Sequence, residues 1–356
     1  MQQSYETDSQ CDHNMDAVVS FLKQNWHRLP VAQWGKPQRM ACVYLTPRFR
    51  ASSHVIAFVM TEGISDPIFV AKIPRLAGDN ARLDREAMNL QMIHTTNASS
   101  IDSIPKVIAY EDHGEDRLLI ETAIAGSPMK PAVVRRRTAQ CLEMVIDWLL
   151  DLPLAAVPVG NGSTSGFNHL VERPLERFKQ QVAGNTKECE MVEQTLVCLA
   201  PLAQARIPSV VEHGDFSHPN VMFAGESKLG VVDWELAEIN GLPATDLFVF
   251  LSYVAFSQHR AKNRAEYLQA FRKAFFGDEA WTPRFMQRYA EHLRLRHDDL
   301  RLLFLACWAR YVSGLVARLE SDHAIDATTL EWLRGNRYYA MWQYTLEHFG
   351  ELRLLS

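Results

Sequence analysis

The sequence predicts an α+β protein of two lobes, in which a small N-terminal lobe with an antiparallel sheet and one packed helix precedes a larger, mainly helical C-terminal lobe. Two observations lead to this fold class. Runs rich in Val, Ile, Phe and Tyr alternate with polar turns over the first 121 residues, which is typical of strands. Apolar residues then recur at helical spacing over most of the remaining chain. At 356 residues, the chain is long enough to form two cores.

The N-terminal lobe is expected to span residues 1–121. Its first 12 residues are polar and predict a disordered tail, and a short amphipathic helix is expected at 16–26. The packed helix follows at 80–94, where an apolar face recurs at helical spacing. Strands are predicted at 40–46, 54–60, 67–73, 106–111 and 117–121.

The composition changes after a short hinge at 122–127, and the helical lobe is expected to span 128–356. A loop at 153–166 is the main insertion between its elements. Helices are predicted at 132–152, 170–182, 189–205, 244–257, 264–276, 283–297, 300–320 and 328–349.

Composition excludes several classes of protein. A formal net charge of −5 argues against a non-specific nucleic-acid binder. The most apolar run, at 300–319, contains three arginines and is too charged to span a bilayer. The N-terminus is acidic, unlike a secretory signal, and the six scattered cysteines predict free thiols. We therefore expect a cytoplasmic protein with no membrane partner, and the sequence does not indicate its oligomeric state.

The most informative stretch is HGDFSHPN at 213–220, followed by VVDWE at 231–235. Asp215 could accept the proton of a hydroxyl nucleophile, while Asn220 and Asp233 present the hard oxygen ligands that Mg²⁺ prefers. Short apolar runs on both sides predict strands that bring Asp233 beside Asn220. Each residue alone could instead form a turn or a cap, and His213 is expected to pack and hold the loop rather than to transfer protons.

These two motifs resemble the signature of the aminoglycoside phosphotransferase and choline kinase superfamily, whose fold is similar to that of protein kinases. The resemblance is specific between residues 213 and 247. It implies that Asp215 is the catalytic base and that Asn220 and Asp233 bind the metal, with ATP and Mg²⁺ as cofactors. The sequence GLPATDL at 241–247 resembles a later family element, in which Asp246 caps a helix and holds the catalytic loop.

The N-terminal lobe should then supply a cation for the phosphates of the nucleotide. Lys72 lies on an otherwise apolar strand, and Glu86 on the next helix is its expected partner, since a buried unpaired charge is costly. An edge-strand lysine that points to solvent is the alternative. The turn at 47–54 contains no glycine, so Ser52 and Ser53 are the candidates for phosphate contacts there.

The segment around Glu121 and Ala123 matches the hinge position, where the family would bind adenine through backbone hydrogen bonds. Its side chains give no independent signal.

The phosphate acceptor is expected to be a small molecule with a hydroxyl group. The HGD motif lacks the arginine of the protein-kinase HRD motif, and no long activation loop follows Asp233. Glu235 and Glu238 could attract a cationic substrate or form an exposed helix start, and the arginines at 135–137 could meet an anion or solvent. A catalytically silent, nucleotide-binding or regulatory protein and an atypical protein kinase are the alternative functions.

Overall fold

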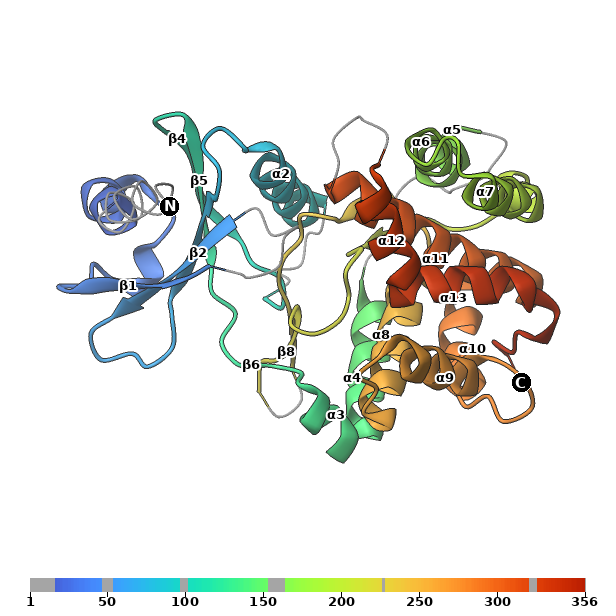
Figure 1. The fold of residues 1–356 in the computed structure, drawn as a ribbon. Helices are drawn as coiled ribbons and strands as arrows, with labels where there is room; N and C mark the ends of the chain where they lie inside the picture. The colour runs from blue at the N-terminus through green and yellow to red at the C-terminus, as the bar shows by residue number, and fades with distance from the viewer. Residues whose placement is uncertain are drawn as a thin grey trace. The chain divides into compact units, whose positions relative to one another are not determined.

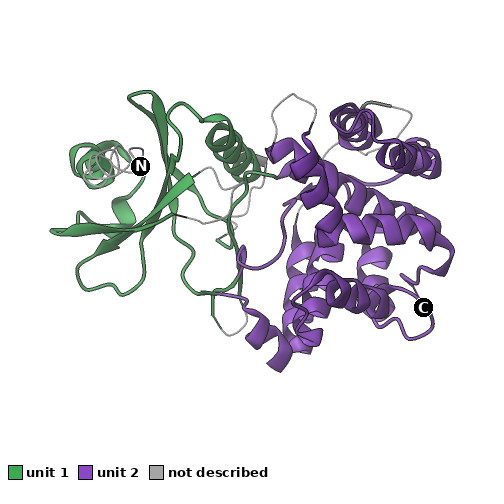
Figure 2. Ribbon diagram, in the orientation of Figure 1, with its two compact units in different colours: residues 1–127, 222–236 green, residues 128–221, 237–356 purple. Residues whose placement is uncertain are grey.

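The computed structural model describes residues 17–46, 54–96, 102–152, 164–225, 228–319 and 325–355. The chain divides into two compact units (Figure 2). Unit 1 comprises Met1–Ser127 and Met222–Leu236, and unit 2 comprises Pro128–Val221 and Ala237–Ser356. The sequence assigned the segment 222–236 to the helical lobe, whereas here it belongs to unit 1.

Unit 1 contains a five-stranded antiparallel sheet of order β1-β2-β3-β5-β4 (Figure 1). This is the predicted sheet, with strand ends that differ from the expected ones by up to two residues. The strands are β1 (Met40–Leu45), β2 (His54–Thr61), β3 (Phe69–Pro74), β4 (Val107–His113) and β5 (Asp116–Thr122).

The two faces of this sheet have separate cores. In β5, Leu118 and Ile120 pack into a cluster with residues of the helical segment 17–25, such as Leu22. Leu119 points to the other face, where it packs against Leu83 and Ala87 of α2 (Ala81–Thr96). This alternation follows from the two-residue period of a strand.

Unit 2 is mainly helical, as the sequence predicts. Short strands β7 (Val210–Glu212) and β10 (Glu238–Gly241) pair within it. Its helices are α3 (Pro131–Arg136), α4 (Thr138–Asp151), α5 (Thr164–Phe167), α6 (Arg173–Gln181), α7 (Thr186–Leu199), α8 (Thr245–His259), α9 (Arg264–Phe275), α10 (Pro283–Leu293), α11 (His297–Leu319), α12 (Ala327–Gly335) and α13 (Arg337–Glu347).

Helix α11 is the central core element of unit 2, packed against α6, α7, α8 and α13. Within the described parts of the chain, it alone is long and apolar enough to cross a membrane. However, 67% of its most apolar window is buried inside the protein. That burial accounts for its apolar composition, because a core helix needs apolar residues on most of its faces.

Two of the predicted long helices are each split by a single residue. The segment 132–152 forms α3 and α4, since Arg137 leaves the helical conformation (φ −132°, ψ 39°). The segment 328–349 forms α12 and α13, which meet at Asn336, whose side chain accepts a hydrogen bond from the Tyr338 N–H at 2.8 Å. An asparagine in this position caps a new helix. Because a second helix begins directly after the first, the apolar pattern of the sequence continues across the break.

Gly126, in the predicted hinge, is fixed by a close backbone approach. It has φ +139°, and a Cβ atom there would lie 1.9 Å from the carbonyl oxygen of Phe223. Only glycine fits both conditions. Phe223 ends β8 (Val221–Phe223), which leads to β9 (Leu229–Val231) and to Asp233.

Candidate active site

In unit 1, Lys72 lies at the centre of a buried charged cluster. Its Nζ atom is 2.5 Å from Glu86 Oε1, 3.3 Å from Glu121 Oε1 and 3.8 Å from Asp233 Oδ1. The Lys72 side chain is 5% exposed and that of Glu86 is fully buried, whereas that of Asp233 is 42% exposed. The expected pair of Lys72 and Glu86 forms, and the alternative of a solvent-facing lysine is wrong.

Strand geometry explains how these groups meet. In the register of β3 and β5, Lys72 lies opposite Leu119, so both side chains point to the α2 face of the sheet. Glu121 is two residues beyond Leu119 and points to the same face. Glu86 reaches the site from α2.

The cluster holds three carboxylates and one ammonium group. Burial lowers the pKa of Lys72, but Glu121, Glu86 and Asp233 outweigh it and raise that pKa above its ordinary value, so the lysine stays charged. Burial raises the pKa of Glu121 to about 8, and it also raises the pKa of Glu86 despite the attraction of Lys72. A second cation or a hydrogen-bond donor close to Asp233 would therefore be stabilised.

Asp233 is held by contacts between the following residue and α2. The Trp234 N–H donates to Glu86 Oε1 at 3.0 Å, and Asn89 Nδ2 donates to the Trp234 carbonyl oxygen at 3.0 Å. Trp234 is fully buried. Asp233 itself adopts the left-handed conformation (φ +72°), which is uncommon for a non-glycine residue and occurs at many functional sites.

Glu235 does not begin an exposed helix, so that expectation is wrong. Its side chain is 13% exposed, 3.6 Å from Arg82 and 3.7 Å from His54. Burial lowers the pKa of His54 to about 4, so its contact with Glu235 is not an ion pair at neutral pH. Burial and Asp233 raise the pKa of Glu235 to about 7. Glu238 begins β10 and lies 3.8 Å from His169.

In unit 2, Asp215 and Asn220 lie in one tightly bonded loop. Asn220 Nδ2 donates to the carbonyl oxygen of Asp215 at 3.0 Å and to its Oδ2 at 3.3 Å. Both contacts use the Nδ2 atom of Asn220, so its Oδ1 atom points away from Asp215 and could bind a metal ion. The Asp215 N–H donates to His213 Nδ1 at 3.2 Å, so His213, which is fully buried, holds the loop as expected.

Asp246 supports the same loop from α8. Its carboxylate accepts hydrogen bonds from the backbone N–H groups of His213 at 2.7 Å and Gly214 at 3.0 Å. The predicted role in holding the loop is confirmed, but α8 has no side-chain cap. Burial, followed by repulsion from Glu212, raises the pKa of Asp246 to about 7.

Glu212 in turn is neutralised by Arg310 of α11. Arg310 Nη1 lies 3.0 Å and 3.1 Å from the two carboxylate oxygens of Glu212, and the side chains of Arg310 and Glu212 are 13% and 4% exposed. Glu212 Oε2 also accepts the Leu242 N–H at 2.9 Å. Gly241 allows this approach, because a Cβ atom there would lie 2.3 Å from Glu212 Cβ.

Tyr311, also on α11, has the helical spacing of a core residue but could also have lined a substrate cleft, and its contact with Asp215 was not predicted. Its hydroxyl donates to Asp215 Oδ1 at 2.9 Å. Burial, followed by the Asp215 charge, raises the pKa of Tyr311 well above its ordinary value, so it remains a donor. The apolar spacing of α11 gave no sign of this contact, since aromatic residues on such a helix usually belong to the core.

The remaining predicted site residues have different outcomes. Ser52 and Ser53 lie outside the described residues. Glu121 is part of β5 rather than of the hinge, and its side chain contacts Lys72. The Ala123 N–H already donates to the Ile68 carbonyl oxygen at 3.1 Å, and the Thr122 N–H donates to Lys106. These two N–H groups are therefore not free to bind adenine. The expectation that the backbone here donates hydrogen bonds to adenine is not met at these two positions.

Comparison with known proteins places the chain in a family. The sequence model of the phosphotransferase enzyme family matches residues 56–289, a span that includes Lys72 and Asp233 of unit 1 and Asp215 of unit 2. The chain belongs to this family. No curated protein matches it.

The chain is also similar to solved structures. The chain is similar to choline kinase LicA from Streptococcus pneumoniae, with 10% identity and a TM-score of 0.53 over 94% of this chain and 99% of that one. This confirms the two-lobed, kinase-like fold. It is also similar to wild-type aminoglycoside 2'-phosphotransferase-IIIa in complex with GDP (12% identity, TM-score 0.47, 94% and 97% covered). Another similar structure is aminoglycoside phosphotransferase APH(3'')-Id from Streptomyces rimosus, in complex with ADP and streptomycin (16% identity, TM-score 0.41, 77% and 98% covered).

Proposed function

We propose that this protein is an ATP- and Mg²⁺-dependent phosphotransferase that transfers the γ-phosphate to a hydroxyl group of a small molecule in the cytoplasm. The observation that carries the proposal is the buried cluster of Lys72, Glu86, Glu121 and Asp233. Such an arrangement is expensive to bury as a purely structural element. It suits a site that binds phosphates and a divalent cation.

The residues present fit Mg²⁺ and the phosphates of the nucleotide. Asp233 offers a half-exposed carboxylate beside an ammonium group, and Asn220 offers an amide oxygen. Among the described residues there is no group of three His, Cys, Asp or Glu that could hold a metal alone. Mg²⁺ takes one or two protein carboxylates together with phosphate oxygens and water, and Asp233 and Asn220 offer oxygens of this kind. When bound, Mg²⁺ neutralises the charge that develops on the phosphates.

Each protein group then has a distinct role. Lys72, fixed by Glu86, contacts the phosphates of the nucleotide. Asp215 accepts a hydrogen bond from the acceptor hydroxyl and takes its proton as the new bond forms. Because Tyr311 engages Oδ1 of Asp215, the oxygen that faces the substrate is Oδ2, which also contacts Asn220.

The proposal is tested by ATP consumption over a panel of hydroxyl compounds and by Asp215→Asn. The variant should lower kcat by roughly 10²-fold or more, since general base catalysis contributes that much. Asp278→Asn, at an exposed residue of unit 2, is a matched control and should keep the parent kcat. Equal turnover of parent and Asp215→Asn would remove Asp215 from the proposed role.

A catalytically silent protein is the alternative. It predicts nucleotide binding that depends on Lys72 but no phosphoryl transfer to any compound of the panel. An atypical protein kinase would transfer phosphate to protein substrates in preference to small molecules.

A further inference from the structure

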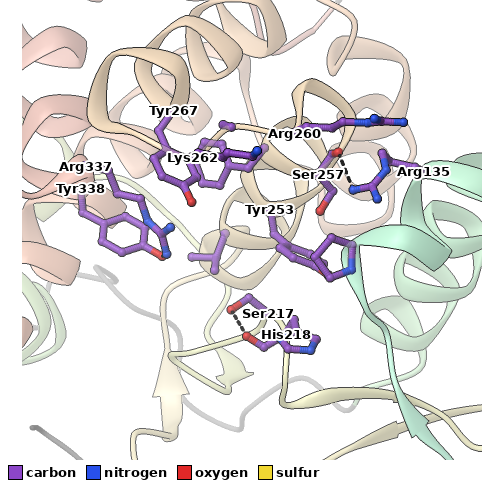
Figure 3. Close-up of a pocket in the computed structure, with 14 residues that line it drawn as sticks. Arg135, Ser217, His218, Tyr253, Ser257, Arg260, Lys262, Tyr267, Arg337 and Tyr338 are labelled. Carbon is purple, nitrogen blue, oxygen red and sulfur yellow. Dashed lines mark hydrogen bonds between the residues drawn. The ribbon is translucent and has the colours of Figure 1, made fainter. Parts of the chain in front are cut away.

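Unit 2 contains a cavity of about 440 Å³ beside the catalytic loop. Ser217 and His218, which follow Asp215 closely in sequence, line the lower side of the cavity in Figure 3. This volume is typical of a small-molecule site. Its aromatic lining consists of Tyr253, Phe256, Tyr267 and Tyr338.

The charged side chains that line the cavity in the described part of the chain are all basic. Four cationic side chains line it, and no Asp or Glu is among its described lining residues. The cations are Arg135, Arg260, Lys262 and Arg337. Burial, followed by repulsion from Lys130, lowers the pKa of His218.

Arg337, at the start of α13, packs against aromatic rings of the cavity lining. Its guanidinium lies 4.6 Å from the ring centre of Tyr267 and 4.7 Å from that of Tyr338, and its Nη2 donates to the Tyr338 hydroxyl at 2.8 Å. It is partly buried, and no carboxylate of the described residues pairs with it. Arg334, three residues earlier, is by contrast paired with Glu188 at 2.8 Å.

The other cations approach from an interhelical turn and from one further helix. Arg260 and Lys262 lie in the turn between α8 and α9, and Arg135 belongs to α3, on the opposite side of the cavity from Arg337 in Figure 3. Arg135 Nη1 donates to the Ser257 carbonyl oxygen at 3.3 Å. The nearby Glu266 accepts the backbone N–H of Lys262 at 2.7 Å and is not a lining residue.

A chain of contacts joins this cavity to the proposed base. The Tyr338 ring, in the cavity lining, is 4.4 Å from the Tyr311 ring. Tyr311 donates its hydrogen bond to Asp215. A molecule bound in the cavity therefore lies close to the group that would take its proton.

We propose that the phosphate acceptor is a hydroxyl compound that carries an oxyanion group, a carboxylate or a phosphate, held by Arg337 together with Arg260 and Lys262. The inference rests on the proposed function. In the step, the acceptor oxygen bonds to the γ-phosphorus, the bond from that phosphorus to the β–γ bridging oxygen breaks, ADP leaves, and the hydroxyl proton passes to Asp215. A planar guanidinium matches an oxyanion in a bidentate manner, whereas a polycationic acceptor would meet repulsion from four like charges.

The test is a binding measurement without nucleotide, so that its result does not depend on turnover. Calorimetry compares four compounds that share one sugar skeleton: glucose 6-phosphate, glucuronate, glucose and glucosamine. The two anions should bind at least about 10-fold more tightly than the neutral and cationic sugars, with an affinity that falls as salt is added. The carboxylate and the phosphate arms also show which oxyanion the site prefers.

Variants connect the binding to the cavity. Arg337→Gln should weaken the tighter anion at least about 10-fold, because a charged hydrogen bond is lost. Arg260→Gln is a second variant, and because Arg260 is exposed we expect this substitution to leave the fold intact. Arg288→Gln, whose arginine pairs with Glu143 and Asp147 elsewhere in unit 2, is the control and should bind as the parent does.

Equal affinity for all four sugars, or tighter binding of glucosamine, would overturn the proposal. So would anion binding that both cavity variants leave unchanged. Anion binding without any phosphoryl transfer would instead contradict the proposed function while leaving the anion site intact.

Discussion

Replacement of Lys72 by methionine separates the structural role of the buried cluster from its proposed chemical role. The substitution keeps the length of the side chain but removes the only cation within 4.0 Å of Glu86 among the described residues. Glu86 is fully buried and loses a contact of 2.5 Å. Breaking one half of a buried ion pair costs about 3–5 kcal/mol, since the remaining charge is uncompensated. We expect a loss of this size in the free energy of unfolding.

A second substitution should recover most of that loss. Glu86→Gln in the Lys72→Met background removes the stranded charge, while its Oε1 can still accept the Trp234 N–H. Neutral groups often replace a buried ion pair without loss of stability. The double variant should therefore be more stable than Lys72→Met alone, with a coupling energy of about 1–3 kcal/mol.

Urea unfolding of the parent, both single variants and the double variant measures this cycle. Lys36→Met, at an exposed position of unit 1, is the control and should cost less than about 0.5 kcal/mol. Nucleotide affinity should be lost in Lys72→Met and should stay lost in the double variant. A cost below about 1 kcal/mol for Lys72→Met, or strict additivity of the two substitutions, would refute the reasoning.

Three further predictions follow from the structure. Tyr311→Phe should lower kcat about 10-fold or more at an unchanged KM for ATP, because Asp215 loses a hydrogen bond; steady-state kinetics equal to those of the parent would contradict this. The pKa of Glu121 rises from 4.5 to about 8 on folding, so the folded protein binds a proton here more tightly than the unfolded chain does. This protonation stabilises the fold at low pH, and the stabilisation is lost as the pH rises through 8. Between pH 6 and 8, the parent should lose up to about 1.4 kcal/mol of stability per pH unit more than Glu121→Gln in urea unfolding, and equal slopes would exclude this. Arg310→Met should cost about 3–5 kcal/mol by leaving Glu212 buried and unpaired, and a midpoint in urea within error of the parent would count against it.

Much of the fold was predictable because local pattern and tertiary structure agree. The strands of unit 1 alternate as strands do, and the long helices of unit 2 follow helical spacing. The breaks at Arg137 and Asn336 were missed, since an apolar face continues across each of them. The pair Gly335-Asn336 did carry a signal, because glycine and asparagine are common where one helix ends and another begins.

The candidate site was predictable where its residues lie in short motifs. Lys72 and Glu86 were also accessible, because a charged residue on an apolar strand requires a partner. The side-chain role of Glu121 could have been found from the two-residue strand period, which places it on the face of Leu119 and Lys72. The contact of Tyr311 with Asp215 could not have been predicted, since it spans 96 positions of the sequence and depends on how α11 packs.

The assignment of the segment 222–236 to unit 1 likewise could not be predicted from local sequence patterns. Its motif follows the loop of Asp215 and Asn220 closely in sequence, which favoured one lobe for both. The Trp234 contacts with Glu86 and Asn89 bind it instead to α2 of unit 1. Hydrogen bonds between residues about 145 positions apart leave no local pattern in the sequence.

The most direct test of the central claim is transfer of labelled phosphate from ATP to a small hydroxyl compound in the presence of Mg²⁺. The parent protein is predicted to form a phosphorylated product with at least one acceptor of the panel, and Asp215→Asn to form it roughly 10²-fold more slowly. No product with any acceptor, from a folded protein that binds ATP, would contradict the claim. A product formed equally fast by Asp215→Asn would contradict the assignment of the base.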